Sequence, residues 1–168
     1  QADGSIQKLG FNPLIGFYEN QPAHWTFFTG ASWMTGDKST IADDPAWKEL
    51  MTWQKAFIDK IGYDKLKAFT AGLGDEWSGD QAFQTGQVAM TMDGEWRVAF
   101  IEDQKPDLNY GTAPFPTGDN HSDIYGGGYS SGDILGIAKG SANPEAAWAL
   151  IKYLSTDTGV QVKLANEI

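Results

Sequence analysis

Two pairs of acidic residues are the first candidates for chemistry, because two carboxylates that flank a glycosidic bond are the usual machinery of glycoside hydrolysis. One pair is Asp75 and Glu76, and the other is Asp93 and Glu95. Adjacent acids in loops and at helix starts also have a simpler use, since they are solvated or favour the helix dipole. We interpret both pairs as non-catalytic, and a glycan-active enzyme that uses Asp93 or Glu95 remains the alternative.

The histidines and glycines indicate no metal or nucleotide site. His24 and His121, the two histidines, are far apart in sequence, and the chain has no cysteine. The glycine run at 126–128 lacks the Gly-Lys-Ser/Thr ending of a phosphate loop and precedes a predicted strand. No Gly-x-Ser-x-Gly motif is present, although a Ser-His-Asp triad without it stays open. We expect no cofactor, no metal and no enzyme activity.

Trp96 is the strongest candidate for contact with a ligand. It follows a predicted strand at 87–92 and Gly94, and it lies at the start of a predicted helix at 95–103. In open α/β sheets, ligands bind beyond the carboxyl ends of the strands, where free N–H groups of helix starts can donate to hydroxyls or anions. An indole there can stack on the C–H face of a sugar ring. A buried, structural Trp96 is the alternative.

The elements that position Trp96 are expected to alternate between strands and helices. Asp44–Pro45 and Asn143–Pro144 each place a capping residue before a proline, as at helix starts, and Gly62 ends the first helix. Ser78 and Gln81 have the spacing of a capping box. The expected helices are 45–61, 78–86, 95–103, one from 144 and one from about 157 to 168, and the expected strands are 5–12, 87–92, 110–114 and 134–138. This order predicts an α/β fold with a mostly parallel sheet.

Composition excludes several classes of partner. The 168 residues carry a net charge of −10, and the 12 basic residues are scattered, so nucleic acid is not an expected partner. No apolar stretch reaches the length of about 18 residues that a membrane-spanning helix requires. Apolar residues make up 41% of the chain, which is enough for a core, and seven are tryptophan. Some of these aromatic side chains are candidates for a ligand platform.

Four motifs in order resemble one family. Phe-x-x-Gly-x-x-Ala-Met at 83–90 is followed by Gly-x-Trp at 94–96, and Tyr-Gly-Thr-Ala-Pro-Phe-Pro occupies 110–116. The glycines at 126–128 precede Leu-Gly-Ile-Ala-Lys at 135–139, and Asn-Pro-Glu-Ala-Ala-Trp occupies 143–148. This set resembles the carbohydrate-binding extracellular solute-binding proteins of ABC importers (family 1, maltose-binding-protein-like). Members of that family are much longer, so the resemblance implies a fragment dominated by the C-terminal lobe.

The resemblance implies a periplasmic-binding-protein-like (type II) lobe with a mixed, mostly parallel sheet flanked by helices. Residues 1–128 would form the second, C-terminal lobe. Residues 129–168 would cross the hinge and add a strand and helices to a first lobe that is otherwise missing. The protein would lie outside the cytoplasm, in the periplasm or lipid-anchored on the outer face of the membrane.

The implied function is non-catalytic capture of a mono- or oligosaccharide between two lobes, for delivery to the membrane subunits of an ABC permease. The full-length protein would be a monomer. A receptor for a polyamine or an organic anion is the alternative within the same fold. By resemblance, Trp96 stacks on the sugar and the glycine run lies near the cleft. The expected ligand-contacting residues are Trp25, Trp33, Trp77, Glu95, Trp96, Gly127, Gly128 and Tyr129.

Overall fold

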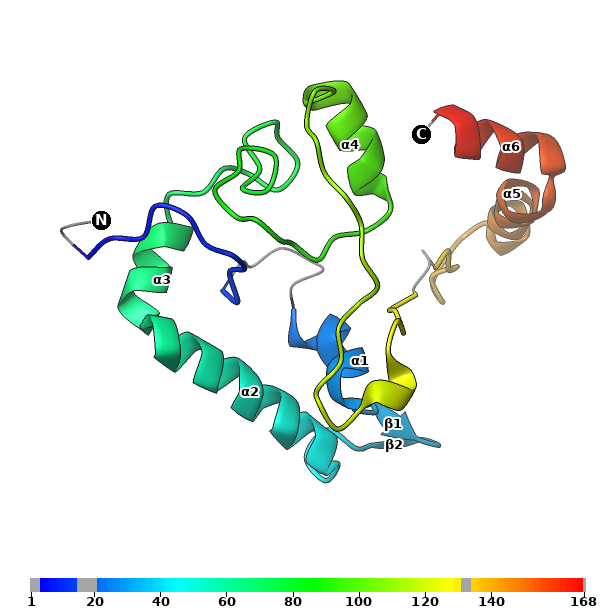
Figure 1. Ribbon diagram of the computed structural model, residues 1–168. Helices are drawn as coiled ribbons and strands as arrows, with labels where there is room; N and C mark the ends of the chain where they lie inside the picture. Colours follow the sequence, from blue (N-terminus) through cyan, green and yellow to red (C-terminus); the bar gives the residue numbers. More distant parts are fainter. Residues whose placement is uncertain (1–3, 15–20, 131–133, 168) are drawn as a thin grey trace. The chain divides into compact units, whose positions relative to one another are not determined.

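A computed structural model describes residues 4–14, 21–130 and 134–167 (Figure 1). The chain divides into two compact units, Gln1–Tyr129 and Ser130–Ile168, which we call the first and the second unit. The expected boundary between the two lobes, at 128/129, lies next to this division. That the units belong to different lobes of a larger protein stays a prediction.

The helices of the first unit follow the sequence pattern closely in most places. The 3-10 helix η2 (Pro22–Trp25) runs into α1 (Thr26–Thr29). The predicted helix at 45–61 is confirmed as α2 (Pro45–Ile61), and the predicted helix at 95–103 is confirmed, displaced by one residue, as α4 (Trp96–Gln104). Between them, α3 (Tyr63–Thr70) was not predicted.

Both ends of α2 are explained by local chemistry. The Oδ1 atom of Asp44 accepts a hydrogen bond from the N–H of Ala46 at 2.9 Å, and Pro45 needs no N–H partner at the first helical position. Gly62 ends the helix with a φ of 103°, a backbone conformation that a residue with a side chain rarely adopts. The helix therefore begins and ends at the residues that the sequence indicates.

The prediction of a helix at 78–86 is wrong. Two backbone N–H groups, those of Phe83 and Gln84, donate to Oε1 of the buried Gln81 side chain at 2.7 and 3.1 Å. Ser78 does not form the expected capping box, since its Oγ accepts from the N–H of Asp80 at 3.2 Å. Residues 78–86 form successive turns instead of a helix, because side-chain oxygens accept from backbone N–H groups in this segment.

The predicted sheet is much reduced among the described residues. Two short strands, β1 (Met34–Thr35) and β2 (Lys38–Ser39), pair antiparallel in a hairpin that was not predicted. The predicted strands at 5–12 and 87–92 form a single parallel bridge, between Leu9 and Val88, with the backbone N–H groups of Leu9, Ala89 and Met90 donating from one segment to the other. The residues at 110–114 and 134–138 form no strand. The mostly parallel sheet is therefore not confirmed among these residues. The physical reason is that a strand closes no hydrogen bonds within itself and needs a partner strand along its length.

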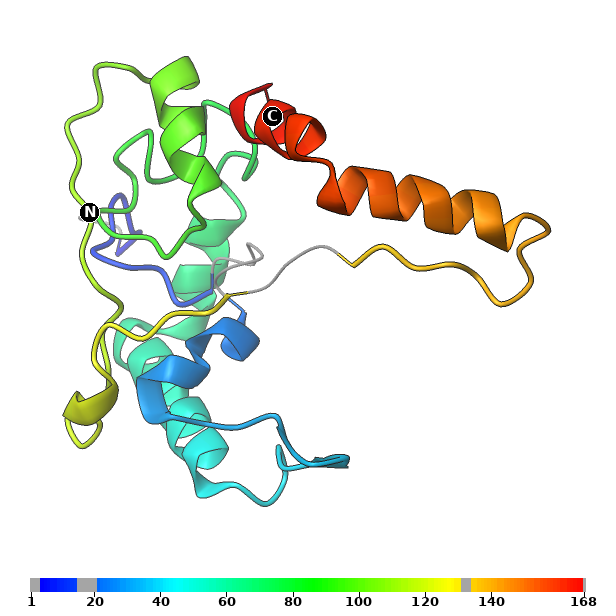
Figure 2. The same cartoon turned by 90° about the vertical axis from the view of Figure 1, so that its right-hand side faces the viewer.

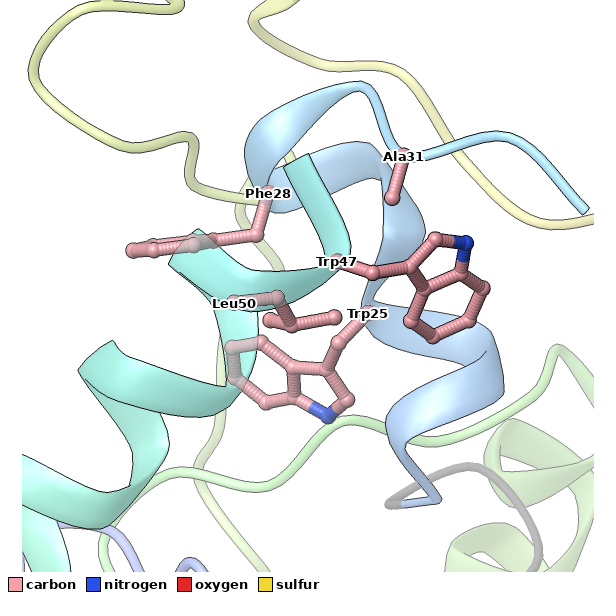
Figure 3. Packing of buried hydrophobic residues seen from close by; sticks show 5 residues of the cluster. All are labelled: Trp25, Phe28, Ala31, Trp47 and Leu50. Atoms are coloured by element: carbon pink, nitrogen blue, oxygen red, sulfur yellow. The ribbon is translucent and has the colours of Figure 1, made fainter. Parts of the chain in front are cut away.

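The core of the first unit is aromatic and lies between η2–α1 and α2. Figure 3 shows Trp25 and Leu50 pointing toward one another and Trp47 turned toward Ala31. The ring of Trp25 also contacts Phe115, at 4.9 Å between centroids. The indole N–H of Trp47 donates to the carbonyl of Ser32 at 2.6 Å, so its polar atom is satisfied inside the core.

The second unit contains α5 (Pro144–Thr156) and α6 (Thr158–Glu167), which confirms both predicted helices (Figure 2); the last predicted residue, Ile168, lies outside the described residues. Asn143 makes no side-chain bond to the helix, so the expectation that it caps α5 is wrong. None of the described residues in this unit is buried, and the large side chains of Trp148, Leu150 and Tyr153 are exposed. No described helix of either unit has the length and apolarity needed to cross a membrane.

Candidate functional site

The start of α4 is built around Asp93. Its Oδ1 accepts from the N–H of Gly94 at 2.9 Å, and its Oδ2 accepts from Nε of Arg97 at 2.7 Å. Residues four apart lie on the same side of a helical turn, so this ion pair fixes the turn from which the helix begins. Both side chains are nearly buried. The carboxylate of Asp93 therefore has a structural use, which weakens its candidacy as a catalytic acid or base.

Gly94 is required because the indole of Trp96 folds back over it. A Cβ atom at position 94 would lie 2.4 Å from two carbons of the Trp96 ring, closer than real Cβ contacts allow. The Trp96 side chain is half-buried, and its Nε1 is buried with no hydrogen-bond partner among the described residues. Trp96 is thus neither wholly in the core nor fully exposed.

Trp77 comes to lie beside Trp96 from a turn nineteen residues earlier in the chain. The ring centroids of the two tryptophans are 6.4 Å apart, and Trp77 is 5.8 Å from the ring of Phe100. Trp96 and Phe100 are four residues apart on α4, so they share one side of the helix. We call Trp77, Trp96 and Phe100 the tryptophan patch. The side chain of Trp77 is 50% exposed and presents an apolar surface to solvent.

The turn that carries Trp77 is attached to α4 by side chains from the helix. Nη2 of Arg97 donates to the carbonyl of Glu76 at 2.8 Å, and Nε2 of Gln104 donates to the carbonyl of Trp77 at 3.4 Å. Gln84 joins the two, since its Oε1 accepts from Arg97 and its Nε2 donates to Gln104, each at 3.1 Å. The geometry of the patch therefore depends on polar contacts underneath it.

One predicted acidic residue adjoins the patch in sequence. Glu95 precedes Trp96, is exposed and makes no side-chain cap to α4. By contrast, Oδ1 of Asp75 accepts from the N–H of Trp77 at 2.9 Å. An apolar platform can stack on a sugar ring, and a carboxylate next to it can accept hydrogen bonds from the hydroxyls of that sugar. Among the described residues, no group of three His, Asp or Glu is placed to hold a metal ion.

The predicted residues Trp25 and Trp33 lie elsewhere in the first unit. Trp25 is buried in the aromatic core and packs against rings of α1, α2 and the 110–116 segment. Trp33 is exposed next to the β1–β2 hairpin and meets Trp47 edge to face at 4.7 Å between centroids. Of the predicted residues, only Trp77, Glu95 and Trp96 are brought to the patch.

The predicted glycine run lies against a different part of the first unit. The N–H of Gly127 donates to the carbonyl of Ile124 at 3.0 Å, and a Cβ there would lie 3.0 Å from the ring of Phe27. Gly128 is exposed with open space around it. Tyr129 is exposed, and its ring lies 4.2 Å from that of His24. Close packing thus accounts for glycine at 127 but not at 128.

Phe100 and Arg97 were not predicted from the sequence. Phe100 could have been found from its spacing of four residues from Trp96, and Arg97 from the same spacing to Asp93. No sequence signal connects Trp77 with Trp96.

One hollow lies along α2, between Pro45 and Ala56, and another lies beside Phe69; neither includes a predicted site residue.

Comparison with known proteins decides the family. Residues 11–161 match the family described as bacterial extracellular solute-binding protein. The chain belongs to this family. The family resemblance drawn from the motifs at 83–96 and 143–148 is thereby confirmed. The word extracellular in the family description agrees with the expected location outside the cytoplasm.

This solute-binding protein is also similar to the solved structure described as "CpMnBP1 with Mannobiose Bound". The two share 26% sequence identity with a TM-score of 0.69, over 90% of this chain and 38% of that one. The chain thus spans 38% of the length of that protein. No curated protein matches the chain.

Proposed function

We propose that the protein is the substrate-binding component of an ABC-type sugar importer, which captures a mono- or oligosaccharide without chemical change. The observation that carries the proposal is the tryptophan patch, in which the half-exposed Trp77 lies beside Trp96 at a helix start. The family and the mannobiose named for the similar structure support the same ligand class. Sugar recognition needs apolar faces for C–H groups and polar groups for hydroxyls.

In this proposal, Trp96 and Trp77 stack on the sugar and Glu95 accepts from a hydroxyl. The predicted contacts of Trp33, Gly127, Gly128 and Tyr129 also remain proposed, and the exposure of Trp33, Gly128 and Tyr129 is compatible with them. The burial of Trp25 favours a packing role over ligand contact for that residue.

The proposal assigns residues 1–128 to the second lobe of a type II binding protein and residues 129–168 to the hinge crossing and to part of the first lobe. The exposed apolar side chains of α5 support this assignment, because such a face needs a cover. In the full-length protein, residues 110–114 and 134–138 would join the mostly parallel sheet. Closure of the lobes on the sugar would shift an open–closed equilibrium.

The proposed partners follow from the same role. The loaded protein would deliver the sugar to the membrane subunits of an ABC permease and would itself be a monomer when full length. It would act in the periplasm or from a lipid anchor on the outer face of the membrane. No nucleic-acid partner is proposed, because the net charge is −10.

The test is thermal unfolding of the full-length protein with mannobiose, mannose, maltose, spermidine and citrate, each at several concentrations. A ligand that binds only the folded state stabilises it by about 2.7 kcal/mol at a hundred times its Kd. We expect a stabilisation that rises with the concentration of at least one of the sugars. Stabilisation by spermidine or citrate alone would identify the receptor for another solute instead.

Variants of the patch connect this result to the site. Trp96→Ala and Trp77→Ala are each expected to weaken sugar binding, since one aromatic contact contributes roughly 0.5–1.5 kcal/mol beyond its buried area. Tyr63→Ala is the matched control, because Tyr63 is another exposed aromatic side chain, at the start of α3. An unchanged affinity in both tryptophan variants would move the site elsewhere.

Turnover separates the receptor from a glycan-active enzyme. We expect the same sugars to be recovered intact after long incubation with the protein. Hydrolysis that Glu95→Gln abolishes would overturn the receptor proposal in favour of catalysis by that carboxylate.

A further inference from the structure

Arg97 is a buried cation that takes no part in the exposed surface of the tryptophan patch. Arg97 is 4% exposed, and its guanidinium carbon lies 5.2 Å from the ring centre of Phe100. Each of its three nitrogens has an oxygen partner: Oδ2 of Asp93, Oε1 of Gln84 and the carbonyl of Glu76. A buried charge is tolerated only where it is paired and hydrogen-bonded in this way.

The bond to Glu76 acts on the peptide unit that leads into Trp77. The carbonyl of this peptide accepts from Arg97 at 2.8 Å, and its N–H, which belongs to Trp77, donates to Oδ1 of Asp75 at 2.9 Å. Both polar groups of one peptide are therefore fixed. Its plane is fixed with them. The bond from Gln104 to the carbonyl of Trp77 holds the next peptide, so the direction in which the Trp77 side chain leaves the backbone is set from both sides.

Secondary structure does not supply this order. The residues from 71 to 86 contain turns but no helix or strand, and a long backbone bond across Trp77, from the N–H of Ser78 to the carbonyl of Asp75 at 3.3 Å, closes only a single turn. What holds the turn to α4 is the network from Arg97 and Gln104, two residues on one side of that helix. Trp96 lies on the same helix, so the network relates the two indoles to each other.

We propose that Arg97 is a positioning residue for sugar binding, which holds Trp77 next to Trp96 without touching the sugar itself. The part of this inference that concerns affinity rests on the proposed function. The part that concerns the order of Trp77 does not. Arginine suits the role because its planar fork reaches three acceptors in fixed directions, whereas the single ammonium of lysine does not.

The first experiment needs no ligand. The full-length protein is labelled with 5-fluorotryptophan, and the fluorine resonances are assigned by single Trp→Phe variants. In Arg97→Lys, which keeps a positive charge beside Asp93, we expect the Trp77 resonance to move toward that of a mobile, solvated indole. The resonance of Trp47, which is bonded to Ser32 in the core, should stay in place and report an intact fold.

The matched control is Lys55→Met. Lys55 forms an ion pair with Asp59 at the same four-residue spacing, but on the exposed side of α2. It should leave the Trp77 resonance unchanged. If Arg97→Lys fails to fold, Gln84→Met replaces it, because this change removes one acceptor of the guanidinium and keeps the pair with Asp93. A Trp77 resonance that does not move in the variant that folds overturns the proposal.

The second experiment measures affinity for mannobiose in a double-mutant cycle. In the natural background, Arg97→Lys should weaken binding about three- to tenfold, which is the affinity that the loss of one aromatic contact would cost. In the Trp77→Ala background, it should weaken binding less than about twofold, because the contact it positions is already gone. Equal losses in the two backgrounds overturn the positioning role. If mannobiose does not bind at all, the sugar-binding proposal fails, and the fluorine spectrum still decides the role of Arg97.

Discussion

Two helices, α2 in the first unit and α5 in the second, begin with the same sequence signal and differ in what they bury. Each starts with a proline after a polar residue and has a tryptophan close to its start. In α2, Trp47 is 6% exposed, whereas Trp148 of α5 is 56% exposed. Asp44 caps α2, and Asn143 makes no side-chain cap to α5.

The difference shows what an amphipathic pattern specifies. Helical hydrogen bonds close within the helix, so periodicity and a proline start are sufficient to indicate both helices. Burial of the apolar face requires a second surface. For α2 that surface is η2 and α1, which lie next to it in the same unit. For α5, within residues 134–167, only α6 packs against it, and its large side chains stay exposed.

The largest expected effect comes from matched leucines. Leu50 is 1% exposed and Leu150 is 57% exposed. Leu50→Ala should lower the free energy of unfolding of this chain by about 2–5 kcal/mol, because it leaves a cavity in the aromatic core. Leu150→Ala should change it by less than about 0.5 kcal/mol. Urea unfolding followed by tryptophan fluorescence measures both.

The same leucine pair tests the proposed lobe assignment. In the full-length protein, a covered α5 would raise the loss from Leu150→Ala toward that of Leu50→Ala. Equal, small losses in the short and the full-length chain would contradict the proposal that a first lobe covers α5.

A smaller effect is expected from matched tryptophans. Trp47→Phe removes one of the two donors to the carbonyl of Ser32, which keeps its bond from Oγ1 of Thr40, so the free energy of unfolding should fall by roughly 0.5–1.5 kcal/mol. Trp148→Phe removes an exposed indole N–H and should be close to neutral in this chain. Thermal unfolding of the two variants beside the natural chain makes the comparison, and a larger loss at position 148 would reverse it.

The capping residues give a smaller, pH-dependent difference. Backbone N–H groups of Ser32 and Ala46 donate to Asp44 and lower the pKa of its carboxyl from the ordinary value of 3.8. A carboxyl whose pKa is lower in the folded state adds stability above its unfolded pKa and loses it as the pH falls through the folded value.

Asp44→Ala should therefore destabilise the chain at pH 7, and the difference from the natural chain should shrink below about pH 4. Asn143→Ala should have little effect at either pH, because Asn143 makes no cap. Urea unfolding at pH 7 and at pH 3 measures both variants. A difference at Asp44 that does not change with pH would contradict the ionised cap.

The smallest expected effect is at the exposed pair of Lys55 and Asp59 on α2. Such pairs four residues apart contribute about 0.3–0.5 kcal/mol, and salt screens them. Lys55→Met should lower the free energy of unfolding by no more than this at low salt and by less in 0.5 M sodium chloride. A larger, salt-independent loss would mean that the lysine stem packs on the helix.

Predictions that rest on local signals are correct where the expected local bond forms and wrong where another partner decides the structure. The boundaries of α2 follow from Asp44, Pro45 and Gly62, which act within one turn of the chain. The turns at 78–86 form because the buried Gln81 side chain accepts two backbone N–H groups, and the capping-box spacing does not reveal this use. The predicted strands at 110–114 and 134–138 depended on neighbours that sequence alone does not identify.

The sequence by itself determined the family, the principal helices and the helix start that follows Gly94, because local bonds and short motifs record these features. Tertiary structure alone decided which aromatic residues lie together. Trp25 was expected at the ligand and is buried in the core, while Trp77 lies beside Trp96. The reason is that contacts between distant segments, such as that of Arg97 with Glu76, leave no periodic trace in the sequence.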